Sequence, residues 1–289
     1  MLFLIISIIL NSYIGLIFKF FEPYKVNIPQ TIILNYWICV ITGVLFSGEI
    51  PISKNSLSQS WFYWAIFMGI LFISIFNIIG ISTQKVGATI TQAANKLSLA
   101  IPVLFSIIFY QEKINELKLL GIILAFISVI LVVWKKKENN QAKSSSIQII
   151  LPILLFIGSG TIDTITKFVE KNFITSASIA NSYLITTFLS AAIVGSIFLI
   201  YKNEKIKLIN IKAALILGIP NYFSIYFLIK ALQIKTLSSS AIIPINNISI
   251  LILVSIVGIF LLNEKISKLN FLGLLLALLS ISLIYLGDK

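Results

Sequence analysis

The sequence predicts an all-α integral membrane protein with ten transmembrane helices, built as two inverted five-helix repeats. Hydrophobic residues make up 58% of the 289 residues and charged residues only 11%, whereas a soluble domain carries about 45–50% and about 25%. The apolar residues form continuous runs of about 20 residues, the length at which a helix crosses a bilayer. A short motif near the end of the first half also returns near the end of the second half.

The ten apolar segments follow one another along the whole chain. They are Met1–Phe20, Gln30–Ser47, Ser60–Ser82, Ala88–Tyr110, Leu117–Trp134, Ile147–Glu170, Ser176–Tyr201, Ile211–Ile234, Ser238–Leu262 and Lys268–Gly287. We expect helices rather than barrel strands because the segments are continuously apolar and do not alternate over about ten residues. The first segment lacks a basic start and a small-residue cleavage site, so we expect a retained helix rather than a secretory signal.

The two halves of the chain repeat one another. A Glu-Lys-Ile turn followed by a glycine-containing apolar segment occurs twice, 152 residues apart. The acidic and basic residues of these turns are Glu112, Lys113, Glu264 and Lys265. Asn95 corresponds to Asn247 at the same shift, and Gly69 corresponds to Gly218. We expect a first repeat at 1–134, a polar linker at 135–146 and a second repeat at 147–289.

An odd number of helices per repeat means that the second copy enters the membrane from the opposite side. Such inverted repeats place a shared cavity near the bilayer midplane and favour alternating access. The paired turns and the two five-helix halves resemble the EamA-type family of the drug/metabolite transporter superfamily. The resemblance implies a secondary transporter of small organic solutes, often an exporter of amino-acid-like metabolites, in the inner membrane of a bacterium.

The positive charge lies in the short connections between the apolar segments. All 22 basic residues are lysines and the net charge is +12; their position in connections favours a membrane-surface role over nucleic-acid binding. The connections after the odd-numbered segments carry more lysines than the other side, which places both termini outside by the positive-inside tendency. The family resemblance implies cytoplasmic termini instead, and both orientations stay open.

Lys96 and Asp163 lie well inside apolar segments, where charge is costly and a functional role is the default interpretation. Lys96 lies about eight residues, or roughly 12 Å, into its segment, and Gln92 and Asn95 lie close to it on the helix. Pro102 follows and is expected to free a backbone carbonyl beside this polar face. We expect Lys96 to face a cavity; the alternative is a lysine that snorkels to the interface.

Asp163 lies on a polar stripe of the sixth apolar segment. The stripe consists of Ser159, Asp163, Thr166, Lys167 and Glu170. Their spacing places these residues on one helix face. A buried carboxylate suits proton coupling, whereas an ion pair of Asp163 with Lys167 one turn away would be purely structural. A pairing of Asp163 with Lys96 requires that their two helices touch.

Amides and tyrosines complete the predicted binding site. Asn246 and Asn247 follow Pro244 in the ninth segment, and amides both donate and accept hydrogen bonds, which suits a zwitterionic or polyol ligand. The alternative is ordinary hydrogen bonding between helices. Further predicted contacts with the substrate are Asn77, Tyr222 and Tyr226. For the two Glu-Lys turns we expect a capping role at the membrane surface.

The residues that are absent narrow the function. The sequence has no phosphate-binding loop, no His and a single Cys, which we expect to pack inside its helix. ATP hydrolysis, zinc chemistry and Ser-His or Cys-His catalysis are therefore excluded for this chain, and we expect no enzyme, metal or cofactor. The expected partners are a small-molecule substrate, the lipid bilayer and a coupling proton, with a monomer or homodimer as the assembly. The rival interpretation is a non-transporting or lipid-translocating subunit of a larger membrane complex.

Overall fold

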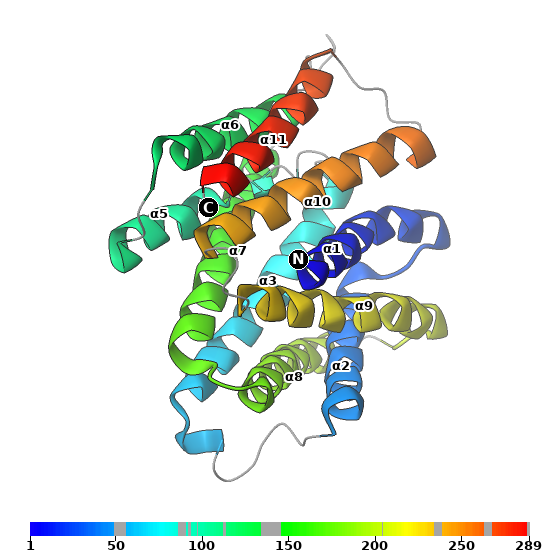
Figure 1. Cartoon of the computed structure of the whole chain (residues 1–289). Helices are drawn as coiled ribbons and strands as arrows, with labels where there is room; N and C mark the ends of the chain where they lie inside the picture. Colours follow the sequence, from blue (N-terminus) through cyan, green and yellow to red (C-terminus); the bar gives the residue numbers. More distant parts are fainter. Residues whose placement is uncertain are drawn as a thin grey trace. The chain divides into compact units, whose positions relative to one another are not determined.

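The computed structural model describes residues 1–48, 56–85, 91, 94–96, 98–111, 114–133, 146–203, 205–233, 239–262 and 268–287. Within these ranges the regular structure consists of helices (Figure 1). Seven of the helices are long and apolar enough to cross a membrane. The predicted all-α membrane fold is therefore confirmed, whereas the number of ten transmembrane helices stays a prediction.

Apart from the fourth segment, the helices follow the predicted apolar segments closely. Their bounds are α1 Leu2–Phe21, α2 Ile28–Ser47, α3 Ser60–Lys85, α5 Ala100–Tyr110, α6 Glu116–Val133, α7 Ser146–Phe173, α8 Ala177–Lys202, α9 Leu208–Leu232, α10 Ser239–Leu262 and α11 Lys268–Gly287. Two short 3₁₀ helices, η1 at Glu22–Tyr24 and η2 at Ser56–Ser58, lie in connections.

Flanking residues fix both ends of α2. The side-chain oxygen of Asn27 accepts a hydrogen bond from the Gln30 N–H at 3.1 Å, which satisfies one of the free donors of the first turn. Pro29 lies in the same turn, where its missing N–H costs nothing. At the other end Gly48 adopts a φ of +67° and donates its N–H to the Val44 carbonyl at 2.9 Å.

The predicted segment Ala88–Tyr110 is not one continuous helix, which corrects the sequence prediction. The chain turns at residues 98–99, and α5 begins after this turn. Pro102 therefore lies in the first turn of α5, where a proline is tolerated. The Ser98 carbonyl, which a proline at position 102 cannot bond, accepts the N–H of Ile101 at 3.0 Å instead.

The chain forms two compact units. Unit 1 consists of Met1–Ile81 and Ile165–Gln233, and unit 2 consists of Ser82–Thr164 and Ile234–Lys289. Each unit thus combines helices from both halves of the sequence. The predicted boundaries at 1–134 and 147–289 concern the sequence repeats rather than these units, and they stay a prediction.

In unit 1 the exposed surface is apolar and the interior contains polar side chains. Leu45 and Ile200 are 79% and 78% exposed, whereas Asn35 and Asn210 are almost completely buried. Water as the solvent would favour the reverse distribution. The apolar exterior therefore suits contact with lipid, in which polar groups turn toward the protein interior.

Two glycines in unit 1 make equivalent close contacts. A Cβ atom on Gly69 of α3 would lie 2.5 Å from the Thr187 carbonyl oxygen of α8. A Cβ atom on Gly218 of α9 would lie 3.0 Å from the Asn35 carbonyl oxygen of α2. Gly69 corresponds to Gly218 in the sequence repeat, and Asn35 and Thr187 are 152 residues apart. Small residues allow such backbone approach between membrane helices.

A second reciprocal pair of contacts joins α2 to α8. A Cβ atom on Gly43 would lie 2.6 Å from the Ile185 side chain, and one on Gly195 would lie 2.7 Å from the Ile33 side chain. Gly43 and Gly195 are 152 residues apart, as are Ile33 and Ile185. The later position of each helix therefore meets the earlier position of the other, so α2 and α8 are antiparallel.

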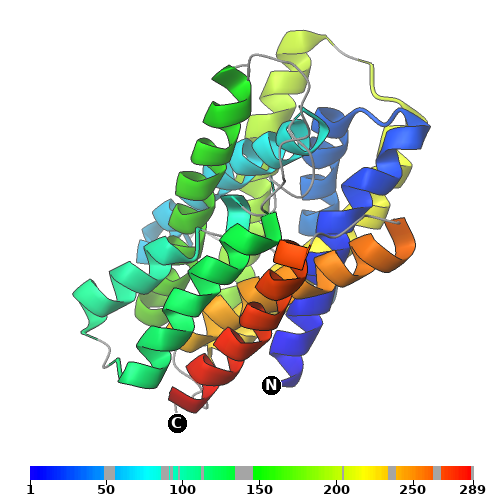
Figure 2. The same cartoon turned by 90° about the horizontal axis from the view of Figure 1, so that it is seen from above.

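In unit 2, α6 and α11 lie side by side and are also antiparallel (Figures 1 and 2). The Ser280 hydroxyl donates to the Gly121 carbonyl at 2.7 Å. The Asn115 amide, just before α6, donates to the Gly287 carbonyl at the end of α11 at 2.8 Å. These bonds connect the two helices that close the predicted sequence repeats.

Candidate functional site

Lys96, Asn247 and Asp163 form a hydrogen-bonded chain in unit 2, which we call the charged bridge. Lys96 Nζ donates to Asn247 Oδ1 at 3.2 Å, and Asn247 Nδ2 donates to Asp163 Oδ2 at 3.0 Å. Lys96 and Asn247 are buried and Asp163 is half-buried. The amide is held in one orientation because its oxygen faces the cation and its nitrogen faces the carboxylate.

Three elements of unit 2 position the charged bridge. Lys96 lies just before the turn at residues 98–99, Asp163 lies on α7 and Asn247 lies on α10. Gly160 brings α7 close to α5, because a Cβ atom there would lie 2.5 Å from the Ile101 side chain. The cation, the carboxylate and the amide therefore meet beside the interruption of the fourth apolar segment.

The charged bridge satisfies groups that would be costly alone in an apolar interior. A buried charge with no partner carries a large desolvation penalty, and a charge-assisted hydrogen bond offsets part of it. Neither charged group bonds the other directly in the described contacts; both bond the same amide.

Two further polar residues of unit 2 have atoms without a hydrogen-bond partner among the described residues. Asn246, next to Asn247, is 5% exposed, and its Oδ1 has none. Ser159 is 6% exposed, and its Oγ has none. The sequence placed Ser159 on the polar stripe one turn before Asp163 but gave no reason to separate it from the other stripe residues. Asn95, the counterpart of Asn247, is half-buried, and its backbone carbonyl accepts from the Ser98 hydroxyl.

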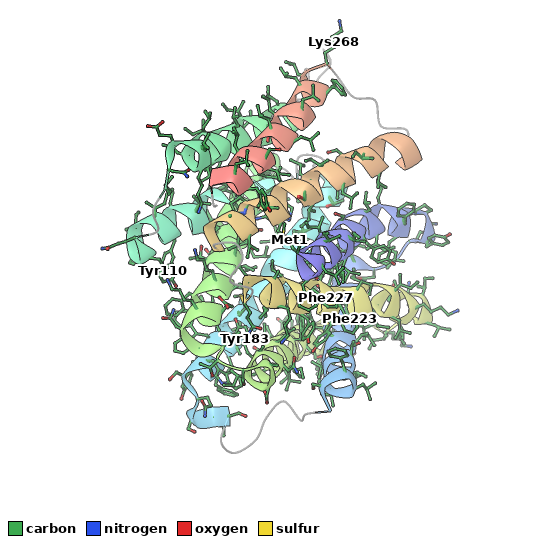
Figure 3. The ribbon with its side chains drawn as sticks, viewed as in Figure 1. Met1, Tyr110, Tyr183, Phe223, Phe227 and Lys268 are labelled. Atoms are coloured by element: carbon green, nitrogen blue, oxygen red, sulfur yellow. The ribbon has the colours of Figure 1, made fainter. Side chains whose placement is uncertain are left out.

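The predicted tyrosines belong to unit 1 and form part of an aromatic row along α9. Tyr222 is fully buried and stacks on Tyr226, with ring centroids 6.1 Å apart. Phe223 and Phe227, both labelled in Figure 3, stack at 6.0 Å on the same helix. Lys230 Nζ lies 5.7 Å from the centroid of the Tyr226 ring, within the range of a cation–π contact.

Asn77 and Lys167 also belong to unit 1. The Asn77 amide donates to the Ile73 carbonyl of its own helix at 2.7 Å. Lys167 is 1% exposed in the last part of α7. The remaining predicted site and signature residues lie outside the described residues, and their roles stay predictions. They are Gln92, Glu112, Lys113, Glu264 and Lys265.

A cluster of amide hydrogen bonds joins the start of α2 to the start of α9, and the sequence did not predict it. Asn210 Oδ1 accepts the backbone N–H of Asn27 at 3.0 Å, and Asn210 Nδ2 donates to Gln30 Oε1 at 2.6 Å. Gln30 Nε2 donates to the Lys205 carbonyl at 3.2 Å. Asn210 is 1% exposed, so this cluster satisfies polar groups inside unit 1.

Apolar helices with a buried polar interior define a multi-pass membrane protein. Residues 148–286 match the EamA-like transporter family, which confirms the resemblance drawn from the repeated turns. The match covers the second of the two sequence halves, and together with the apolar helices it supports a transporter of the drug/metabolite type.

Two whole-chain similarities accompany the family match. An uncharacterised protein from Haemophilus influenzae is 29% identical over 299 residues, which cover 99% of this chain and 98% of the relative. A protein of known crystal structure superposes with a TM-score of 0.75 at 13% identity, over 99% of this chain and 96% of that chain. The second similarity concerns the fold alone.

Proposed function

We propose that the protein is a secondary transporter that exports a small zwitterionic metabolite, such as an amino acid, across a bacterial inner membrane. The observation that carries the proposal is the charged bridge, because Asn247 holds a cation and a carboxylate on its two sides. The carboxylate of a zwitterion would bind Lys96, and its ammonium group would bind Asp163. Charge-assisted hydrogen bonds of this kind are stronger than neutral ones.

Alternating access between two inverted repeats is the proposed mechanism. Support comes from unit 1, where the contacts of Gly69 and Gly218 and the contacts of Gly43 and Gly195 are reciprocal. Residue pairs that exchange roles in this way are typical of a two-fold axis. The antiparallel direction of α2 and α8 supports an axis that runs across the helices, as inverted repeats require. A proton gradient would supply the driving force, and Asp163 would be the group that carries the coupling proton.

Transport by purified protein in proteoliposomes tests this proposal. We expect flux of at least one radiolabelled amino acid, and we expect Lys96→Ala and Asp163→Asn each to abolish that flux while the protein stays folded. Thr164→Val is the matched control, because the Thr164 hydroxyl bonds the Gly160 carbonyl of its own helix at 2.7 Å. Flux that is unchanged in both charge variants would remove the charged bridge from the mechanism.

A further inference from the structure

Ser159 and Asn246 are buried polar residues of unit 2, and each has a side-chain oxygen without a hydrogen-bond partner among the described residues. Thr161 and Thr164 on α7 each donate to the carbonyl one turn earlier, at 2.8 and 2.7 Å. Hydroxyls in apolar helices usually satisfy themselves in this way. Ser159 Oγ does not, although the residue is only 6% exposed.

Asn246 also differs from several amides of other helices. Asn11, Asn77 and Asn172 each donate to the carbonyl one turn earlier in their helices, at 2.9, 2.7 and 2.7 Å. Asn246 makes no such bond in the described part of α10, and its buried Oδ1 has no partner. A buried polar atom without a partner costs free energy and calls for an explanation.

Both unpaired groups belong to residues that lie close along their helices to members of the charged bridge. Ser159 precedes Asp163 by one turn on the same face of α7, which is about 6 Å along the helix. Asn246 is the sequence neighbour of Asn247, with its Cα about 3.8 Å away. The two residues therefore lie in the same parts of α7 and α10 as Asp163 and Asn247.

We infer that Ser159 and Asn246 form an uncharged part of the binding site that takes a hydroxyl or carboxamide group of the substrate. A hydroxyl and an amide each donate and accept hydrogen bonds and carry no charge. They are therefore complementary to a neutral group that also does both. The inference rests on the proposed function: the charged bridge binds the zwitterion, and the uncharged part selects its side chain.

Binding of matched amino acids to the purified protein tests this inference. L-threonine and L-valine have nearly the same shape, as do L-asparagine and L-leucine, but only the first of each pair carries a neutral polar group. We expect the wild-type protein to bind the polar member at least about tenfold more tightly, because its absence leaves buried polar groups unpaired. Ser159→Ala should reduce this preference by about tenfold and leave the affinity for L-valine and L-leucine unchanged.

Asn246→Leu should reduce the same preference, whereas Asn247→Leu should weaken the binding of all four amino acids. Thr164→Val serves as the control and should preserve both affinity and preference. Equal binding of the matched amino acids to the wild-type protein would overturn the inference without any variant. Equal losses for both members of a pair in Ser159→Ala would do the same, while the transport proposal would stand. If none of the four amino acids binds, the inference fails, and if no amino acid at all is transported, the zwitterion proposal fails as well.

Discussion

Lys96 and Asp163 should be energetically coupled through Asn247. The test replaces them by Lys96→Met and Asp163→Asn, singly and together, because both substitutions keep side-chain length while removing the charge. Each single variant leaves the opposite charge without its compensating partner. Removing one member of a buried charge pair costs about 3–5 kcal/mol, and the half-buried position of Asp163 places both variants near the lower end.

The coupling energy follows from the separation of the charges. The hydrogen bonds of 3.2 and 3.0 Å and the width of one amide place Lys96 Nζ within about 8 Å of Asp163 Oδ2. Two unit charges at this distance interact by about 2 kcal/mol at an effective dielectric constant of about 20. The double variant should therefore lose about 2 kcal/mol less than the sum of the two single losses.

Unfolding of the purified protein in detergent micelles, followed by circular dichroism, measures these free energies. A second cycle that combines Lys96→Met with Thr164→Val should be additive, because the Thr164 hydroxyl bonds only its own helix among the described contacts. Independent sites add to within about 0.5 kcal/mol. If the losses in the free energy of unfolding for Lys96→Met and Asp163→Asn add to within that margin, Lys96 and Asp163 are not coupled through Asn247 and the reasoning is refuted.

Three further outcomes are expected in unit 1. Gly69→Ala and Gly218→Ala should each destabilise the protein by about 1–3 kcal/mol, because the new Cβ would lie within 3.0 Å of a backbone carbonyl; Gly80→Ala, which meets only side chains, should cost less in the same unfolding assay. Asn210→Leu should cost about 2 kcal/mol, because it leaves buried amide groups unpaired; an unchanged unfolding midpoint would contradict a stabilising role for that cluster. Cys39 is 0% exposed and should therefore react with a maleimide only after unfolding. Fast labelling of the native protein would contradict the burial of this side chain.

The membrane helices were predictable because a helix that crosses lipid needs a long apolar segment. The composition of such a segment is enough to predict a helix. Lys96, Asp163 and Asn247 were also recognisable, because polar groups at that depth are costly unless they have a use. Their mutual contact was not predictable. It depends on how the middle of α7 approaches α10, and residues 84 positions apart in sequence give no local signal for that approach.

Other features escaped prediction for local reasons. Pro102 indicated an irregular backbone, but the turn lies at residues 98–99 because a proline fits the first turn of a new helix better than the interior of an old one. Ser159 was one of several polar residues on its stripe. Only the geometry distinguishes a hydroxyl that bonds its own backbone from one that does not.

The turn at residues 98–99 places Lys96 and Ile101 on opposite sides of a joint in the backbone. Ile101 is packed against Gly160 and is anchored to α7, whereas Lys96 precedes the joint. A swivel about these two residues would carry the ammonium group away from Asn247 while α5 keeps its place. Among the described hydrogen bonds, those from the Leu99 N–H to the Lys96 carbonyl at 3.3 Å and from the Ser98 hydroxyl to the Asn95 carbonyl span the joint, so these are bonds that such a swivel would have to break.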